Sequence, residues 1–347
     1  MRLERREEVP LTLAATAPVV AIAAALALAA GLIAAAGVSP FYAYGEMMRG
    51  AFGSRLAVTE MLTRATPLIL TGLAAAVAFR GRLWNIGAEG QFYLGALMTA
   101  WVGHSLSLAP VPGIALLCLV GMAAGAALLA GPAYLRLRFG VDEVVTTLLL
   151  NFIVILFVGL MIEGPLKDPL AFGWPQSVPV DDAYRLPDLV ARSRLHIGLL
   201  LAVVAAALVW LVMSRTVFGM EARAAGLNAS AAAFAGVSLP RTLLGVAVLS
   251  GALAGLAGAI EVMGVTAGVT TTMSPGFGYA GIVVAMLAAL HPIGVVGAAI
   301  FVATIFVGAD AMSRATGVPS FIADVIVALS LLTMLVALLF TSYRLRR

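Results

Sequence analysis

The sequence predicts an all-α polytopic membrane protein with about ten transmembrane helices in a 5+5 inverted-repeat arrangement and both termini in the cytoplasm. Of its 347 residues, 62% are hydrophobic and 11% are charged, whereas about a quarter of the residues in a soluble domain are charged. The mean hydropathy is +1.06, and apolar runs of about 20 residues, long enough to cross a hydrocarbon core, recur along the chain. Arginines gather at the ends of these runs, as the positive-inside rule expects, so the net charge of +4 does not indicate a nucleic-acid partner.

The apolar runs predict the helices in order. They cover residues 11–38, 59–79, 86–103, 112–135, 144–162, 196–213, 242–263, 279–290, 293–312 and 321–341. The first run is predicted to be a retained helix, because a cleaved signal peptide has an apolar core of only about 7–15 residues. Residues 39–58 mix apolar and charged side chains and predict an outer loop with room for an interfacial helix.

The polar segments set the predicted topology of a single transmembrane domain, 1–347. Ten crossings place the charged start, 1–9, and the basic tail, 343–347, together in the cytoplasm, whereas nine would leave the tail outside. The proline-rich segment 163–194 is predicted to be an irregular external loop, and 214–241 a cytoplasmic loop.

Two of the predicted helices are interrupted. Run 279–290 is too short to span a membrane alone, and it follows the sequence SPGFG at 274–278. Run 86–103 begins behind the glycine-broken stretch 85–90. Interrupted helices at matching positions of two halves indicate the binding region of a transporter.

A weak internal repeat relates the two halves. Aligning Gly131 with Gly308 also aligns Gly140 with Gly317 without a gap. In the predicted topology the helices of the two copies run in opposite directions, so the repeat is predicted to be inverted.

The sequence lacks the motifs of several enzyme classes. A nucleotide-hydrolysing domain needs a glycine-rich loop ending in Lys-Ser or Lys-Thr, but the single lysine, Lys167, is followed by Asp168. No catalytic spacing of nucleophile and base is evident, and the lone Cys118 predicts neither a disulfide framework nor a cysteine metal site. The histidines are scattered and predict no metal site: His104, His196 and His291.

The most polar stretch beside a helix in the first half is 80–91. Ionisable and amide side chains at membrane depth are tolerated where they line a cavity or are buried in protein. Asn85, Glu89 and Gln91 are therefore predicted either to hydrogen-bond a polar solute on its pathway or to brace a broken helix. Asn151, in the fifth apolar run, is predicted to face the bundle interior, as a contact between helices or as part of the same pathway.

The cytoplasmic segment 220–241 carries a second candidate site. Glu221 is predicted in the first turn of a short helix, where a carboxylate suits the positive end of the helix dipole. Pro240 would begin the next helix, where its missing N–H is not needed. Small side chains would let a partner approach closely: Ala222, Ala225 and Gly226. The segment is either a plain connector or a stiff helix, parallel to the membrane, that transmits force from a partner.

This segment resembles the coupling motif of permease subunits of ABC importers, in the family that serves branched-chain amino acids, simple sugars and nucleosides. The spacing from Glu221 to Val237 is similar to that of the motif, and Leu239-Pro240 follows in the expected place. The segment departs from the motif at Arg223, where alanine is usual, and in a glycine that comes one position early. The resemblance assigns coupling to an ATPase to Glu221, Ala222, Ala225, Gly226, Leu239 and Pro240.

Three further stretches are similar to the nucleoside-type members of this family. They are WNIGAEGQ at 84–91, GVDEVVTT at 140–147 with Asn151, and GFGYAGI at 276–282, and the resemblance extends over about 15–341. It implies that the chain translocates nucleosides or related simple sugars by alternating access, in the prokaryotic cytoplasmic (inner) membrane. It implies no enzymatic activity and no cofactor for the chain itself.

The resemblance also implies partners besides membrane lipid. These are a cytoplasmic ATP-binding subunit, a second permease subunit in a homo- or heterodimer, and an extracytoplasmic solute-binding protein. Two alternatives stay open: an ABC permease for branched-chain amino acids, and a stand-alone ion-coupled secondary transporter. The second needs an intramembrane carboxylate, for which Glu261 and Asp324 are the candidates.

Overall fold

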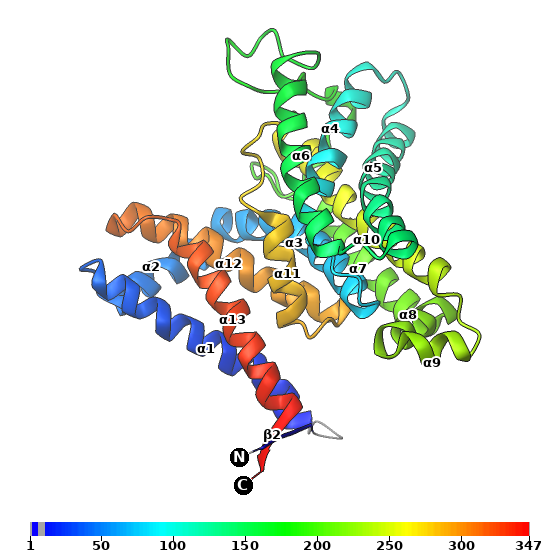
Figure 1. The fold of residues 1–347 in the computed structure, drawn as a ribbon. Helices are drawn as coiled ribbons and strands as arrows, with labels where there is room; N and C mark the ends of the chain where they lie inside the picture. The colour runs from blue at the N-terminus through cyan, green and yellow to red at the C-terminus, as the bar shows by residue number, and fades with distance from the viewer. Residues whose placement is uncertain (1, 6–10, 347) are drawn as a thin grey trace.

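The structure is a computed structural model that describes residues 2–5 and 11–346, and it is helical apart from two short strands (Figure 1). The helices are α1 (Leu11–Ala35), α2 (Pro40–Phe52), α3 (Arg55–Arg80), α4 (Ala88–Ser105), α5 (Pro110–Phe139), α6 (Glu143–Glu163), α7 (Gly198–Arg215), α8 (Val217–Leu227), α9 (Ala229–Phe234), α10 (Leu239–Glu261), α11 (Phe277–Leu287), α12 (Pro292–Thr316) and α13 (Ile322–Ser342). A π-helical turn, η2 (Val262–Thr266), continues α10.

Each predicted apolar run overlaps one of these helices, and α2 occupies the segment predicted as an outer loop. Within the described residues, six helices are long and apolar enough to cross a membrane: α3, α5, α6, α7, α10 with η2, and α12. Helices α1 and α2, bent by 114° from each other, would form a seventh span, whereas α11 and α13 are apolar but shorter. The polytopic helical class is confirmed, and the count of ten crossings stays a prediction.

The two ends of the chain lie side by side (Figure 1). Strand β1 (Arg2–Arg5) pairs antiparallel with β2 (Tyr343–Arg346), with Arg2 opposite Arg346. The rest of the predicted charged start, 6–9, lies outside the described residues. The cytoplasmic location of both ends stays a prediction.

The two halves of the chain interlock through α3 and α10. Helix α3, from the first half, packs against α11 and α12, while α10, from the second half, packs against α4 and α5. Gly140 and Gly317 both end their helices, α5 and α12, in the left-handed conformation, with φ of 68° and 74°. The aligned glycines therefore have the same structural role, which supports the repeat, although its inverted direction stays a prediction.

Small residues let α5 and α10 approach each other at backbone contact. A Cβ added at Gly255 would collide with the carbonyl oxygen of Gly121, and one at Gly251 would collide with that of Gly125. These glycines repeat every fourth residue on each helix, as expected where helices pack closely in lipid.

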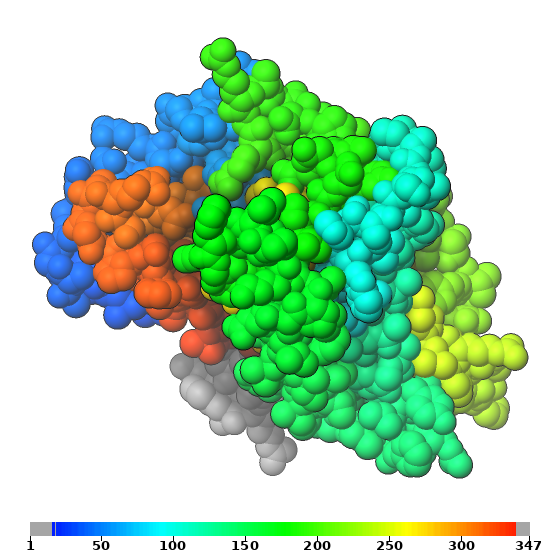
Figure 2. Space-filling view, turned by 90° about the horizontal axis from the view of Figure 1, so that it is seen from above, coloured from blue at the N-terminus to red at the C-terminus, as the bar shows by residue number. Residues whose placement is uncertain are grey.

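An irregular segment covers one end of the bundle, as predicted for 163–194. Its only helical turn among the described residues is η1 (Asp182–Tyr184). The segment hydrogen-bonds the equally irregular stretch that precedes α11: Ser177 N donates to Val269 O at 2.9 Å, and Val180 N donates to Ala267 O at 2.9 Å. In the view from above, this green segment lies between α4, in cyan, and the orange and blue region of α12 and α2 (Figure 2). Its location outside the membrane stays a prediction.

Candidate functional site

Asn151, on α6, ties together three segments that are far apart in the sequence. Its Oδ1 accepts a hydrogen bond from the N–H of Gly90 at 2.8 Å. Its Nδ2 donates to the carbonyl of Ile86 at 2.8 Å and to the hydroxyl of Tyr279 at 3.2 Å. Asn151 thus joins α6 to the turn before α4 and to the first turns of α4 and α11.

Asn85 and Gln91 close the turn before α4 with a reciprocal pair of hydrogen bonds. Asn85 Nδ2 donates to Gln91 Oε1, and Gln91 Nε2 donates to Asn85 Oδ1, both at 2.9 Å. Asn85 Nδ2 also donates to Ser250 Oγ on α10 at 3.0 Å, and this hydroxyl donates to the carbonyl of Ala74 on α3 at 2.7 Å. Because Asn85 and Gln91 are 0% and 1% exposed, these bonds satisfy amides that would otherwise be costly to bury.

Glu89 joins the two interrupted helices. Its Oε2 accepts a hydrogen bond from the N–H of Gly278, in the first turn of α11, at 2.6 Å. A carboxylate is favourable at a helix N-terminus because the unpaired N–H groups there carry partial positive charge. Thr71 on α3 adds a second tie, because its Oγ1 donates to the carbonyl of Phe277 at 2.9 Å.

The four predicted pathway residues therefore lie together, buried and hydrogen-bonded to their own chain. We call Asn85, Glu89, Gln91 and Asn151 the polar brace. Among the described residues, none of the four lines the cavities of about 730, 360 and 380 Å³ that are described below. In this conformation they brace the broken helices, and their contact with solute stays a prediction.

Glu143, on α6, holds the turn that leads from α3 to the polar brace. Its Oε1 accepts hydrogen bonds from Arg136 Nη1 at 2.6 Å and from the N–H of Trp84 at 3.3 Å. Arg136 Nη1 also donates to the carbonyl of Arg82 at 2.7 Å. Glu143 belongs to a stretch that resembles the family, but the sequence alone gave it no role.

The predicted coupling segment contains the helix α8. Thr216 caps its start, and Asn228 caps the start of α9. Because α8 begins at Val217, Glu221 lies in its second turn and not in the first turn as predicted. There its Oε2 accepts a hydrogen bond from Thr242 Oγ1 at 3.3 Å, which ties α8 to the base of α10.

The small residues of α8 face its own chain. Ala222 and Gly226 are buried, and a Cβ added at Gly226 would collide with the carbonyl oxygen of Arg80, at the end of α3. Ala225 is half-buried and lines a cavity of about 360 Å³ between α8 and α10. The small side chains thus bring α8 close to α3. They were predicted instead to let a partner approach closely.

Other residues form the exposed apolar surface of α8 and α9. Met220, Leu227 and Phe234 are 56%, 76% and 96% exposed. Leu239 and Pro240 form the first turn of α10, and Pro240 begins this helix as predicted.

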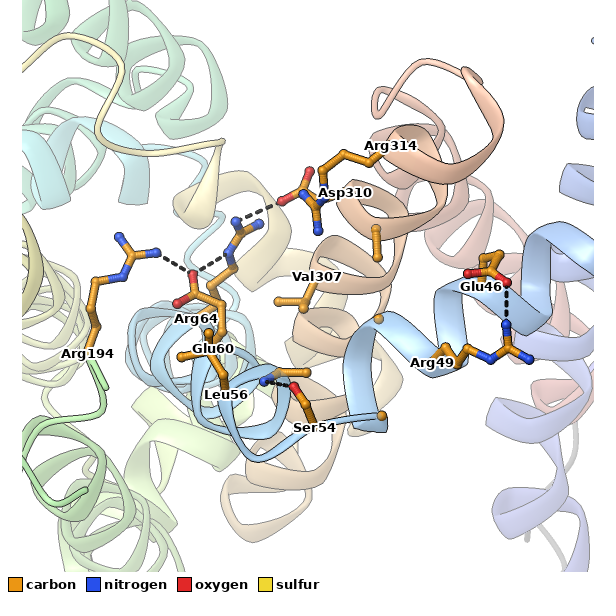
Figure 3. A pocket seen from close by; sticks show the side chains of 14 residues that line it. Glu46, Arg49, Ser54, Leu56, Glu60, Arg64, Arg194, Val307, Asp310 and Arg314 are labelled. Carbon is orange, nitrogen blue, oxygen red and sulfur yellow. Dashed lines mark hydrogen bonds and ion pairs between the residues drawn. The ribbon is translucent and has the colours of Figure 1, made fainter. Parts of the chain in front are cut away.

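A cavity of about 730 Å³ opens between α2, α3, α12 and the segment before α7 (Figure 3). Its charged side chains are Glu46, Arg49, Glu60, Arg64, Arg194, Asp310 and Arg314. Glu60 Oε1 pairs with Arg194 Nη2 at 2.7 Å and with Arg64 Nε at 3.4 Å. Arg64 Nη2 then reaches Asp310 Oδ2 at 2.8 Å, so that a chain of ion pairs links three elements.

A second cavity, of about 380 Å³, shares this chain of ion pairs as a wall. It reaches Glu261, at the end of α10, and Phe277, at the start of α11. Because Phe277 directly precedes the residue held by Glu89, the cavity lies against the polar brace.

Residues 57–341 match the family described as branched-chain amino acid transport system, permease component. The matched region includes the polar brace, α8 and the chain of ion pairs. The chain belongs to this family. The permease is therefore a multi-pass membrane protein, in agreement with its apolar helices.

The permease also resembles individual proteins along almost its whole length. It is 36% identical to the glucose ABC transporter permease protein TsgB13 of Haloferax volcanii, over 99% of this chain and 93% of the relative. It is 34% identical to the guanosine ABC transporter permease protein NupP of Bacillus subtilis, over 91% of each chain. The guanosine ABC transporter permease protein NupQ of the same bacterium is 28% identical, over 70% of this chain and 78% of the relative. All three are ABC transporter permeases, and this chain is a permease subunit of that kind.

The family assignment confirms the resemblance seen in the sequence and decides against the stand-alone ion-coupled transporter. The two carboxylates proposed for that alternative differ in their exposure. Glu261 is 7% exposed beside the smaller cavity, whereas Asp324 is exposed in the first turn of α13.

Sequence reasoning missed the chain of ion pairs, although a signal was present. Glu60 and Arg64 stand four residues apart within an apolar run, and Asp310 lies within another. An ionisable residue inside a transmembrane segment is by default a candidate functional residue.

Proposed function

We propose that the permease is the membrane-spanning subunit of an ATP-driven importer of nucleosides. The observation that carries the proposal is that the permease matches NupP across nearly its whole length, with the polar brace and α8 inside the matched family region. A hexose is the second candidate solute, because TsgB13, named a glucose permease, is similar to the same extent. Branched-chain amino acids have only the name of the family in their favour.

The packing supports a mechanism for alternating access. Closure of an ATPase dimer would push on the exposed face of α8. Because Gly226 rests on the carbonyl of Arg80, α8 would move the end of α3 and the turn that follows it. The brace would pass this movement on to α11 through the bond from Gly278 to Glu89. The interrupted helices would then change the side of the membrane to which the bundle opens.

The partners follow from what the chain lacks and from its relatives. The sequence has no phosphate-binding loop, so a separate cytoplasmic subunit would bind ATP. NupP and NupQ are two guanosine permeases of one bacterium, and this chain is more similar to NupP. We therefore propose a heterodimer with a NupQ-like permease, an extracytoplasmic solute-binding protein, and a location in the prokaryotic cytoplasmic membrane with both termini inside.

Uptake of labelled guanosine, glucose and leucine tests this function in cells that carry the permease with its neighbouring transport genes. We expect guanosine uptake that survives a protonophore. We also expect a Leu227→Asp/Phe234→Asp variant, changed only on the exposed face of α8 and α9, to lose this uptake at an unchanged membrane level. A Gly131→Ala variant serves as control, because a Cβ at Gly131 meets nothing within 4 Å. Uptake that the protonophore abolishes and the variant does not affect would contradict the proposal.

A further inference from the structure

The chain of ion pairs leaves acceptor atoms unused inside the cavity. Glu60 engages its arginines through Oε1, and Asp310 engages Arg64 through Oδ2. Within the described chain, Glu60 Oε2 and Asp310 Oδ1 accept no hydrogen bond. Arg64 holds both carboxylates with one guanidinium, and both residues line the same two cavities.

These groups are partly shielded from water. The side chains of Glu60, Arg64 and Asp310 are 22%, 28% and 34% exposed. Both oxygens are still open to solvent, and hydrogen bonds are stronger where water competes less. A solute that donates to both oxygens would therefore be favoured over a solute that leaves them unmet.

The balance of charge favours a neutral solute. Around the smaller cavity, the guanidiniums of Arg64 and Arg194 are paired with the carboxylates of Glu60 and Asp310. An anion or a cation would meet as many repelling as attracting groups, whereas hydroxyl and amide groups can bond to either kind.

The lining of the smaller cavity is also suited to a ring. It includes Phe277, Met273 and Pro275, and the hydroxyl-bearing Thr63 and Thr266. An aromatic face stacks on the flat or apolar face of a ring. The volume of about 380 Å³ falls within the usual range of small-molecule sites, roughly 300–1,000 Å³.

We propose that this cavity is a solute-binding subsite of the permease that recognises a vicinal diol. The two hydroxyls donate to Glu60 Oε2 and Asp310 Oδ1, and the rest of the solute packs on Phe277. A ribose and a hexose share this chemistry, so the proposal deepens the proposed function, on which it rests. Such a subsite would give the permease a solute selectivity separate from that of a binding protein.

The test is the ratio of uptake between solutes with and without the diol. The complete importer is reconstituted in proteoliposomes. Guanosine is compared with 2′,3′-dideoxyguanosine, and glucose with 2,4-dideoxyglucose, because neither analogue has two adjacent hydroxyls. Asp310→Asn should lower the preference for the diol by about ten-fold, the effect of one hydrogen bond to a charged group. Glu163→Gln, which changes an exposed carboxylate at the end of α6, should leave the preference unchanged. A preference unaltered in Asp310→Asn would overturn the proposal and make the ion pairs a structural clamp.

The two solute pairs separate the proposal from the proposed function. If glucose is transported and guanosine is not, the nucleoside assignment fails, and the uptake ratio of glucose to 2,4-dideoxyglucose still tests the subsite.

A second measurement does not require transport or a charge-altering variant. Val265 lines the smaller cavity, and Val265→Cys in a Cys118→Ala background provides one thiol there. We expect guanosine or glucose to slow its reaction with a maleimide, and the analogue without the diol to have no effect. A reaction rate that none of these solutes changes, in an importer that assembles normally, would also overturn the proposal.

Discussion

The carboxylate of Glu89 accepts a hydrogen bond at 2.6 Å from the backbone of Gly278, 189 residues further along the chain. A Cβ at Gly278 would collide with the backbone N of Glu89, so no larger residue fits at this contact. The first turns of the two interrupted helices are therefore a single joint. A change at either residue should therefore affect both α4 and α11.

Replacing Glu89 should separate this joint. Glu89→Ala leaves the N–H of Gly278 buried without a partner, and we expect the free energy of unfolding to fall by about 1–3 kcal/mol. Glu89→Gln keeps an acceptor oxygen and should lose less. Thermal unfolding of the purified complex measures both changes, with Glu163→Ala as an exposed control. Equal stability of Glu89→Ala and the control would show that the bond contributes nothing.

Gly226 should control the coupling of ATP hydrolysis to uptake. In Gly226→Ala the new methyl group meets the carbonyl oxygen of Arg80, so α8 has to move away from α3. We expect the ATPase to remain active while uptake per ATP falls at least about ten-fold, equivalent to about 1.4 kcal/mol of lost coupling. Parallel ATPase and uptake measurements in proteoliposomes test this, and Gly131→Ala should retain full coupling. Parallel loss of both activities would point to failed assembly.

Gly255 should be intolerant of any side chain. Gly255→Ala places a methyl group against the backbone of Gly121, and overpacking of this kind destabilises by about 3 kcal/mol or more. Gly131→Ala, on the same α5 that Gly255 contacts but in open space, should be neutral or stabilising by up to about 1 kcal/mol. Thermal unfolding of the two variants should therefore differ in sign relative to the parent. Two similar melting temperatures would mean that α5 and α10 can move apart at little cost.

His196, just ahead of α7, should make the protein less stable in acid. The side chain is 1% exposed, and this burial lowers its pKa from 6.5 to about 4; Arg185 lowers it further, and Asp188 raises it. Above the unfolded pKa of 6.5 both states are neutral and stability is complete. As the pH falls from there toward 4, only the unfolded chain takes up the proton, so that about 2 kcal/mol is lost by pH ~5.

Replacement of His196 by a side chain that does not titrate isolates this effect. We expect His196→Gln to melt at a more nearly constant temperature between pH ~7.5 and ~5 than the parent protein does. An equally steep pH dependence in the variant would assign the acid sensitivity to other groups.

The helices could be predicted because each apolar run carries its own evidence of length and polarity. The same holds for α8, whose segment is marked by Pro240 on one side and by small residues within it. The meeting of Asn151 with Ile86 and Tyr279 could not be predicted, because it depends on how α6 and α11 pack around α4. The four brace residues were identified by their polarity. The groups to which they hydrogen-bond could not be predicted.

The direction in which a residue faces was harder to predict than its position. Gly226 was expected to face a partner, but a small residue serves equally well wherever two surfaces approach, and here it faces Arg80. Arg64 and Asp310 come from separate apolar runs, so only the packing of α3 on α12 shows that they form a pair.

The burial of α3 among helices of the second half has a consequence for biosynthesis. Thr71 on α3 bonds to Phe277, 206 residues later, and a ribosome adding about 5–20 residues per second needs roughly 10–40 s to make that stretch. Throughout this interval, the face of α3 that packs against α11 and α12 in the finished protein has lipid or an insertase as its neighbour. The nascent chain is therefore most vulnerable to quality-control proteases before its last quarter is synthesised.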